Sequence, residues 1–283
     1  MIRRPPRSTQ GVSSAASDVY KRQVGCGTVG KALLKAQESG KLTLPIAGIA
    51  SRTEHTAQSF LKGLENPPAY CSIEELIIKA DLIVEAAGGY AVPELARVTF
   101  AAGKDLMVIS VGALLDHPEV LDLAKEQGCK LYAPSGAIAG LDGIKSASSV
   151  RIDYVTITTR KSPKALEGSP YLVDKGISVI GLTEEQEVFS GTAREACRGF
   201  PAIVNVSAAV SLAGIGPDQT RIRIMAVPGL KRNCHEIDME GEFGKLHMRI
   251  ENIPTENPRT GRLTVMSIIR TLQGITDPIQ IGT

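Results

Sequence analysis

The sequence predicts an α/β fold in which a doubly wound parallel sheet precedes a second α/β domain with a largely antiparallel sheet. Three observations support this prediction. Short apolar segments alternate with helical patterns as far as residue 136, which is typical of a parallel sheet covered by helices. A glycine motif, VGCGTVG, opens the first helix. After Ser148, apolar and polar residues alternate, which is typical of strands with one buried face.

These changes of pattern divide the chain into four segments. Residues 24–134 form the expected first domain, and residues 135–254 form the second. Residues 255–283 read as a loop and an apolar helix, which we expect to pack back onto the first domain. Residues 1–23 fit neither domain.

The N-terminal segment is rich in Arg and Ser, and Asp18 is its only acidic residue. An organelle transit peptide is one interpretation, whereas a secretory signal is excluded because an apolar core is missing. We favour a third interpretation, since MIRRPPRST and SSAASDVYKRQ resemble translated sequencing adapters. The first strand should be covered on both faces, so the polar run 21–23 suits it poorly. We expect residues 1 to about 18 to be disordered, with Val19–Val24 as a poor substitute strand.

The first domain is expected to alternate strictly between strands and helices. The expected strands are Leu44–Ser51, Ala80–Gly88, Asp105–Leu114 and Lys130–Gly136. The expected helices are Thr28–Glu38, 55–64, Pro93–Ala102 and Pro118–Gln127. Helices on both faces of the sheet follow from this order.

The second domain shows strand patterns in SVRIDYVTITTR, RIRIMAVPG and CHEIDMEGEFGKLHMRIEN. One helix candidate, residues 191–214, interrupts them. The last pattern, over residues 256–274, is a loop followed by the apolar helix.

The glycine motif predicts a dinucleotide-binding turn of the Rossmann type. Gly25, Gly27 and Gly30 fit G-x-G-x-x-G, with Thr28 and Val29 inside the motif. The first glycine permits the tight turn, the second lets backbone approach a pyrophosphate, and the third lets helix pack on strand. The anion is then held by the free N–H groups at the helix N-terminus.

The end of the second strand bears on the choice between NAD and NADP. An acidic residue that binds the ribose 2′-hydroxyl is usual there, but this chain has Ser51 and Arg52, and its first acid is Glu54. Arg52 and Ser51 suit a 2′-phosphate, which favours NADP(H) or the use of both cofactors. A solvated loop arginine is the alternative.

Two further strand ends are expected beside the nicotinamide half of the cofactor. They carry Ala87 and Gly88 after one strand and Gly112 after the next. Ligands of open α/β sheets bind at this carboxyl edge.

Composition limits the other classes of function. The chain has 283 residues, 43% apolar and 22% charged, with a net charge of +2. This balance gives no reason to expect a nucleic acid or a membrane surface as partner, and no apolar run reaches the length of a membrane span. The five cysteines are scattered without metal-binding spacing, so we expect reduced thiols in a cytoplasmic protein and no metal site.

Four histidines are present, and pattern alone singles out none as catalytic. His55 and His117 lie at expected helix starts and are expected on the surface. His235 and His247 lie in expected strands.

Five motifs in the chain resemble the L-aspartate dehydrogenase family, in order and at plausible spacing. They are PSGAIAGLDGIKSA, TTRK, FPAIVNVSAAVSLAGIG, NCHEIDMEGEFG and ENPRTGRLT. The resemblance extends from Val24 to about Gly274. It implies a Rossmann domain followed by a substrate domain that carries a homodimer contact. It also implies the reversible, NAD(P)-dependent deamination of L-aspartate through iminoaspartate, which in this family can feed pyridine nucleotide biosynthesis.

The resemblance also implies roles for individual residues. The family's catalytic histidine falls on His235, where an imidazole can activate water or move a proton during carbinolamine collapse. Two cofactor contacts carry over to Ala137 and Asn205. Strand alternation places Asn233 on the same face as His235 and Glu236 on the other, so we expect Asn233 in the site and treat Glu236 as structural.

The substrate has two carboxylates, which need N–H groups and cations. Ser135 and Gly136 precede an apparent helix whose N–H groups suit a carboxylate. Lys145, Arg160 and Lys161 are the cationic candidates, and the sequence does not rank them, although Lys161 is retained as a possible contact.

Two other interpretations stay open. Homoserine dehydrogenase and dihydrodipicolinate reductase share the two-domain plan, although their characteristic catalytic stretches are not found. A protein that senses NADP(H) without turnover is a different class, and it would need no proton-transfer residue such as His235.

Overall fold

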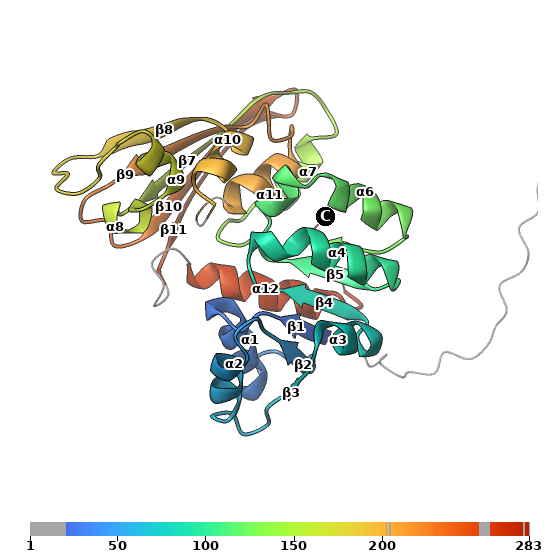
Figure 1. The fold of residues 1–283 in the computed structure, drawn as a ribbon. Helices are drawn as coiled ribbons and strands as arrows, with labels where there is room; N and C mark the ends of the chain where they lie inside the picture. The colour runs from blue at the N-terminus through green and yellow to red at the C-terminus, as the bar shows by residue number, and fades with distance from the viewer. Residues whose placement is uncertain (1–20, 202, 204, 255–260, 280, 283) are drawn as a thin grey trace, which may run out of the picture.

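The computed structural model describes residues 21–201, 203, 205–254, 261–279 and 281–282. Two sheets organise the molecule (Figure 1). The first has six parallel strands in the order β3-β2-β1-β4-β5-β6. The expectation of disorder for residues 1 to about 18 lies outside the described residues.

The first sheet and its helices take up residues 21–132 together with the C-terminal helix. The strands are β1 (Lys21–Val24), β2 (Ile46–Ala50), β3 (Ala69–Tyr70), β4 (Leu82–Glu85), β5 (Asp105–Val108) and β6 (Leu131–Tyr132). The helices are α1 (Thr28–Glu38), α2 (Glu54–Leu61), α3 (Ile73–Lys79), η1 (Gly89–Ala91), α4 (Val92–Ala101), α5 (Ala113–Asp116), α6 (Glu119–Glu126) and α12 (Arg262–Gly274).

Strand β4 shows how the sheet buries both faces. Leu82 and Val84 pack in one apolar core with Leu33 of α1 and Ile268 of α12. Ile83 points to the other core, which α3, α4 and α6 complete. Alternate side chains of one strand therefore enter two cores, which is why the strand reads as a continuous apolar run. The doubly wound prediction is confirmed.

Strand β1 lies in the middle of this sheet. It pairs with β2 on one side and β4 on the other, so that Val24 lies beside both Ala50 and Glu85. The strand order reverses at this point, which is where open α/β sheets bind their ligands. The backbone of Lys21–Val24 thus occupies the place of the expected first strand, as the substitute strand predicted above.

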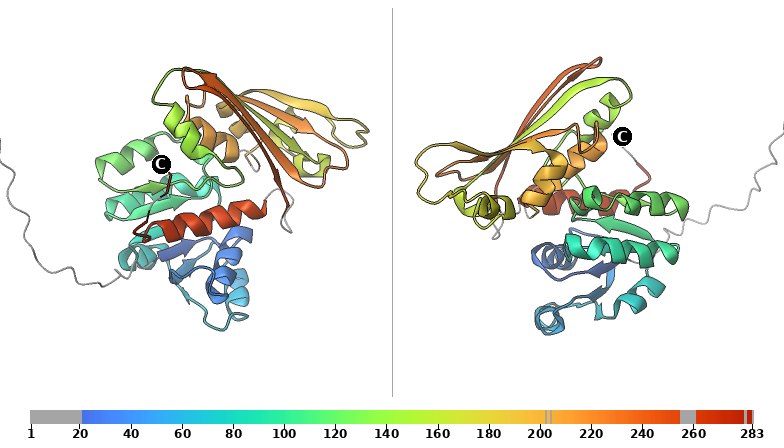
Figure 2. Two further views of the ribbon diagram at one scale, coloured as in Figure 1. Left: turned by 180° about the vertical axis from the view of Figure 1, so that it is seen from behind. Right: turned by 45° about the horizontal axis from the view of Figure 1, so that its top comes forward.

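The second sheet is mixed and mostly antiparallel, in the order β11-β10-β7-β9-β8, and only β7 and β9 pair in parallel. Helices α7, α10 and α11 bury one of its faces. Figure 2 shows this sheet standing above the first domain, with α12 beside α1 where the two domains meet.

The strands of the second sheet are β7 (Ile152–Lys161), β8 (Gln186–Thr192), β9 (Arg221–Ala226), β10 (Asn233–Gly241) and β11 (Gly244–Asn252). The helices are α7 (Leu141–Ala147), α8 (Pro163–Leu166), α9 (Pro170–Asp174), α10 (Ala193–Gly199) and α11 (Asn205–Ala213).

Three expected elements differ clearly in the structure. The strand expected over Lys130–Gly136 is only the two-residue β6. The single helix expected over 191–214 is two helices, α10 and α11, with Pro201 between them. Proline lacks an N–H and disfavours helical backbone in the residue before it, so the break is expected there. The strand expected to reach Leu114 ends at Val108, and Leu114 belongs to the short helix α5. Elements that the patterns missed are β3, β8, α3, η1, α5, α8 and α9.

Polar contacts join the two domains near the carboxyl edge of the first sheet. The N–H of Gly112 donates to Oδ1 of Asn205 at 3.0 Å. Arg194 of α10 donates to the carbonyl of Leu115, and Arg198 pairs with Asp116 at 3.0 Å. In the part of the chain described, no helix has the length and apolarity needed to cross a membrane.

The position of β1 predicts that its polar sequence limits stability. The triple change Lys21→Val, Arg22→Ile and Gln23→Val should raise the free energy of unfolding by roughly 2 kcal/mol or more, because the backbone of β1 pairs with a strand on each side and central parallel strands are apolar in sequence. Denaturant titration measures the difference. Lys245→Val in the exposed strand β11 is the control and should change stability by less than about 0.5 kcal/mol. Equal stability of the triple variant and the parent would contradict the prediction.

Candidate active site

The glycine turn after β1 has the geometry of a phosphate-binding turn. Gly25 has φ of +105°, and a Cβ there would lie 2.4 Å from the carbonyl oxygen of Ala86, so only glycine fits. Gly27 caps α1, Thr28 begins it, and Gly30 is buried inside it. The free N–H groups at the N-terminus of α1 lie beside a hollow of about 250 Å³. These residues fit a dinucleotide.

Arg52 lies on the wall of the same hollow, with Ser51. Its guanidinium is stacked over the ring of Tyr90, 5.3 Å from the ring centroid, which restrains an otherwise exposed side chain. Beyond this pair lies a second, mostly apolar hollow that includes Tyr70 and Ile73 and suits a flat base. Arg52 therefore lies between the two hollows, and its contact with a 2′-phosphate stays a prediction.

The expected nicotinamide-side residues line the next part of the groove. Ala87 lines the hollow of about 250 Å³ beside the glycine turn, called the phosphate hollow below. Gly88, Gly112 and Asn205 line a hollow of about 560 Å³ between the domains. Asn205 also lines a smaller cavity of about 100 Å³, so the two spaces adjoin.

This smaller cavity is built by both domains. Val29, Ile109 and Val111 come from the carboxyl edge of the first sheet, and Ile268 comes from α12. The sequence-predicted residues that line it are Val29, Ser135, Gly136, Ala137, Lys161, Asn205, Asn233 and His235. Residues far apart in the chain therefore converge on one space.

His235 is 1% exposed and contacts Thr159, whose Oγ1 lies 3.1 Å from Nδ1 of the ring. The register of β10 and β7 pairs these two residues directly. Burial, and secondarily the charge of Lys161, lowers the pKa of His235 to about 3. The ring is therefore neutral near pH 7. Thr159 holds one ring nitrogen, which leaves Nε2 for proton exchange in the cavity.

Lys161 is the second titratable group of the cavity, and it is only 3% exposed. Burial lowers its pKa to about 8, so most of it is charged at pH 7. None of the described residues places a carboxylate at ion-pair distance from it. A buried ammonium group without a counter-ion favours an anion in the cavity beside it.

The chain matches two family models and many known proteins. The model "Homoserine dehydrogenase, NAD binding domain" matches residues 25–134, and "Aspartate dehydrogenase, C-terminal" matches residues 142–275. An L-aspartate dehydrogenase of Methanosarcina mazei is 46% identical over 265 residues, covering 92% of this chain and 98% of that protein. The chain belongs to the L-aspartate dehydrogenase family. The resemblance stated from the motifs is confirmed.

Solved structures agree on the fold. The crystal structure of aspartate dehydrogenase from Thermotoga maritima superposes with a TM-score of 0.73 at 24% identity, covering 93% of this chain and 99% of that one. A homoserine dehydrogenase from Thiobacillus denitrificans gives a TM-score of 0.58 at 14% identity, covering 91% and 73%. The two-domain plan is thus shared beyond the L-aspartate dehydrogenase family.

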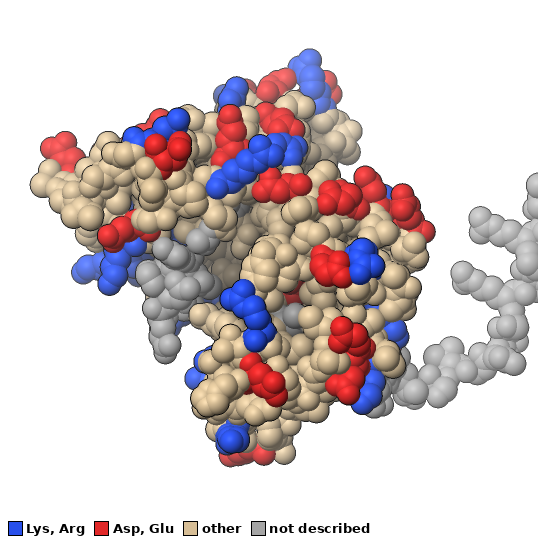
Figure 3. All heavy atoms as spheres, viewed as in Figure 1, with Lys and Arg blue, Asp and Glu red and all other residues tan. Residues whose placement is uncertain are grey.

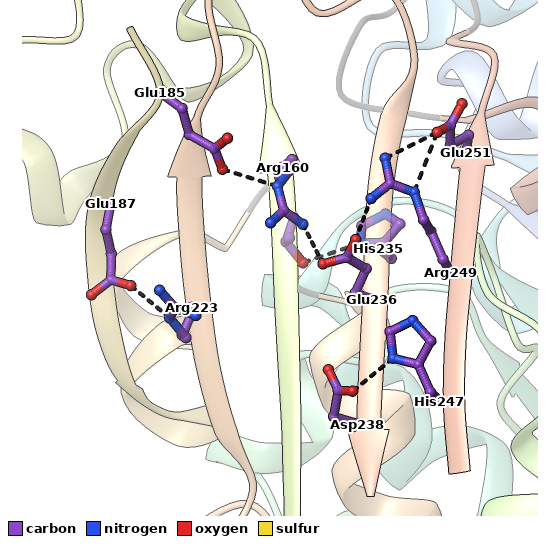
Figure 4. Close-up of polar contacts among 11 residues, drawn as sticks. Arg160, Glu185, Glu187, Arg223, His235, Glu236, Asp238, His247, Arg249 and Glu251 are labelled. Atoms are coloured by element: carbon purple, nitrogen blue, oxygen red, sulfur yellow. Dashed lines mark hydrogen bonds and ion pairs between the residues drawn. The ribbon is translucent and has the colours of Figure 1, made fainter.

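The other cationic candidates lie away from the cavity. Arg160 follows Thr159 in β7 and so points to the opposite face of the sheet, where it pairs with Glu185 at 2.9 Å and with Glu236 (Figure 4). Glu236 also binds Arg249 on that face. Lys145 is exposed on α7. Among the three candidates, only Lys161 lines the cavity.

The remaining histidines lie outside the cavity as well. His247 pairs with Asp238 at 2.6 Å on the outer face of the second sheet (Figure 4). His117 pairs with Glu119 at 2.9 Å, and His55 is exposed. Figure 3 shows charged side chains of both signs spread over the face that it presents. The described residues hold no cluster of three or more His, Cys, Asp or Glu suited to a metal ion.

Two residues of this site were missed from the sequence. Thr159 lies in the TTRK motif, but its contact with His235 depends on the pairing of two distant strands. Asn252 is 4% exposed, and its Nδ2 donates to the carbonyl of Ala137 at 2.6 Å. This bond holds the segment with Ser135 and Gly136 against the end of β11. No local pattern marks Asn252, because its partner Ala137 lies 115 residues away in a loop.

The buried charge of Lys161 predicts a stability cost. Lys161→Met should raise the free energy of unfolding of the ligand-free protein near pH 7 by roughly 2 kcal/mol, since burial disfavours the charged form. The folded-state pKa of about 8 lies below the ordinary 10.5. Between these values the unfolded chain holds a proton that the folded protein has released, so parental stability rises with pH and the advantage of the variant shrinks.

Denaturant titrations at pH 7 and pH 10 measure both effects. Lys145→Met is the matched control, because its side chain is exposed, and it should track the parent at both values. A Lys161→Met variant that is less stable than the parent at pH 7 would show that the ammonium group has a partner.

Proposed function

We propose that the protein is an NAD(P)-dependent L-aspartate dehydrogenase. The observation that carries this proposal is the cavity in which His235 and Lys161, which has no carboxylate partner among the described residues, face the carboxyl edge of the dinucleotide-binding sheet. Its reaction would be L-aspartate + NAD(P)⁺ + H₂O ⇌ oxaloacetate + NH₄⁺ + NAD(P)H + H⁺. Family membership and the fit of the glycine turn to a dinucleotide support it.

The cavity suits a small dianionic substrate. Lys161 supplies a charge that a carboxylate would neutralise, which offsets the cost of its burial. Ser135 and Gly136 line the same space. The helix expected directly after them, α7, begins only at Leu141, so they would offer backbone N–H groups of a loop to a second carboxylate. Asn233, next to His235 on the same face, is a further polar contact. The substrate Cα would then lie between these residues and the nicotinamide side of the groove.

The chain's own residues would handle protons. A bound oxidised nicotinamide would supply the acceptor for the hydride that leaves Cα of aspartate. The charge of Lys161 helps to lower the pKa of His235, so a substrate carboxylate beside Lys161 would raise it. His235 would then take a proton from the water that attacks the imine carbon and return it to the departing amine. Thr159 keeps the ring oriented for both steps. The apolar residues Val111 and Ile268 limit the access of further water.

Finer features follow from the same proposal. We infer a dinucleotide-binding unit over residues 24–134, a substrate unit over 135–254, and a returning C-terminal helix. The family resemblance supports a homodimer and the supply of iminoaspartate to pyridine nucleotide biosynthesis. The five free cysteines support a cytoplasmic location.

The test of the reaction follows NADPH and NADH oxidation with oxaloacetate and ammonia. His235→Ala should lower the rate at least a hundredfold, within the usual range for losing an acid–base group. His247→Ala removes an exposed histidine and should leave the rate within about twofold. A folded protein that binds NADPH and shows no oxidation would overturn the proposal and favour the sensor.

The test of cofactor choice uses Arg52. Arg52→Gln should weaken NADPH binding roughly tenfold or more and leave NADH binding within about twofold, because only NADPH carries the 2′-phosphate. Arg97→Gln on α4, where the exposed Arg97 pairs with Glu94, is the matched control. Equal losses for both cofactors, or no loss, would show that Arg52 does not bind the phosphate.

A further inference from the structure

Glu85, the last residue of β4, is a buried acidic residue with no assigned role. It is 0% exposed, and both carboxylate oxygens accept hydrogen bonds. Oε1 accepts from the N–H groups of Ala87 at 2.8 Å and Gly88 at 2.7 Å, and from the hydroxyl of Ser110 at 3.1 Å. Oε2 accepts from the N–H groups of Ile109 at 3.2 Å and Ser110 at 2.9 Å.

The five bonds all come from two chain segments, 87–88 and 109–110. No salt bridge joins Glu85 to any described Lys or Arg, so these bonds are what stabilises its burial. A carboxylate is an acceptor-only group, which matches the four backbone N–H groups directed at it. The ladder between β4 and β5 ends at Glu85 and Val108, so the carboxylate continues the connection where the strands stop pairing.

Both segments form walls of the ligand groove. Ala87 lines the phosphate hollow, Gly88 and Ser110 line the hollow between the domains, and Ile109 lines the His235 cavity. The glycine turn rests on the same support, because Gly25 packs against the backbone of Ala86. One side chain therefore fixes the relative positions of the surfaces that meet at the nicotinamide side.

We propose that Glu85 is a positioning residue for the nicotinamide half of the cofactor. The proposal rests on the proposed dinucleotide-dependent function. Of the four residues that donate to Glu85, Ala87 also lines the hollows beside Arg52, whereas Gly88, Ile109 and Ser110 line the spaces on the nicotinamide side. The loss of Glu85 is therefore expected to act mainly on that side. A glutamine at this position keeps the shape but turns an NH₂ group toward N–H donors. Bonds to at least one segment are then lost, and the nicotinamide-side walls move apart while the Arg52 end remains.

The experiment measures the binding of whole cofactors and of their adenosine fragments by calorimetry. The pairs are NADPH with adenosine 2′,5′-bisphosphate, and NADH with AMP. Glu85→Gln should weaken the binding of whichever dinucleotide the parent binds at least tenfold and leave the matching fragment within twofold. Glu94→Gln on α4, an exposed glutamate in a surface pair, should leave all four affinities within twofold.

Each outcome decides the matter. An unchanged dinucleotide affinity in Glu85→Gln overturns the positioning role and leaves the proposed function standing. Equal losses for dinucleotide and fragment also overturn it, since they show a general structural role. A parent protein that binds neither dinucleotide removes the proposed function and this proposal together.

Hydrogen exchange on the parent protein gives a second test if Glu85→Gln does not fold. The amides of Ala87, Gly88 and Ser110 should be protected in the absence of cofactor, because they donate to a buried carboxylate. Rapid exchange of these three amides, beside protected amides in β4 and β5, would overturn the proposal.

Discussion

A buried ammonium group without a counter-ion is the constraint around which the site is arranged. Lys161 is 3% exposed, and no described carboxylate offsets its charge. Its charge adds to burial in keeping His235 neutral. An anionic substrate that enters the cavity would therefore offset the free-energy cost of burying the charge of Lys161. It would also lie beside His235, the proposed proton-transfer group. The proposed binding of an anionic substrate depends on this combination of a buried cation with a neutral imidazole.

The fold makes this pairing possible by bringing two sheets together at one edge. The carboxyl ends of β1, β2, β4 and β5 provide the groove for the cofactor, and the inner face of β7 and β10 provides Lys161 and His235. Asn205 and Asn252 connect the parts, the first to Gly112 and the second to Ala137. Cofactor and substrate surfaces are thus held by hydrogen bonds that cross between segments distant in sequence.

Features that depend on local pattern were predictable, and features that depend on strand pairing were not. The glycine turn and the motif around His235 are local, so their places in the fold followed from sequence. The sequence did not rank Lys161 above Arg160, because it did not tell which face of β7 is buried. Thr159 and Glu85 act through partners 76 and 25 residues away, and no periodicity reports such contacts. The single helix predicted over 191–214 was wrong, because Pro201 lacks an N–H and disfavours helical backbone in the residue before it.

The most direct test of the central claim is the binding of a dicarboxylate that does not react. L-Malate, titrated in the presence of NADP⁺ or NAD⁺, should bind the parent protein and perturb the NMR signals of the His235 ring. In Lys161→Met the malate affinity should fall at least tenfold, the scale of a lost buried charge contact, while Lys145→Met keeps it. Equal malate binding by the parent and Lys161→Met would contradict the claim that the buried ammonium group recruits the substrate.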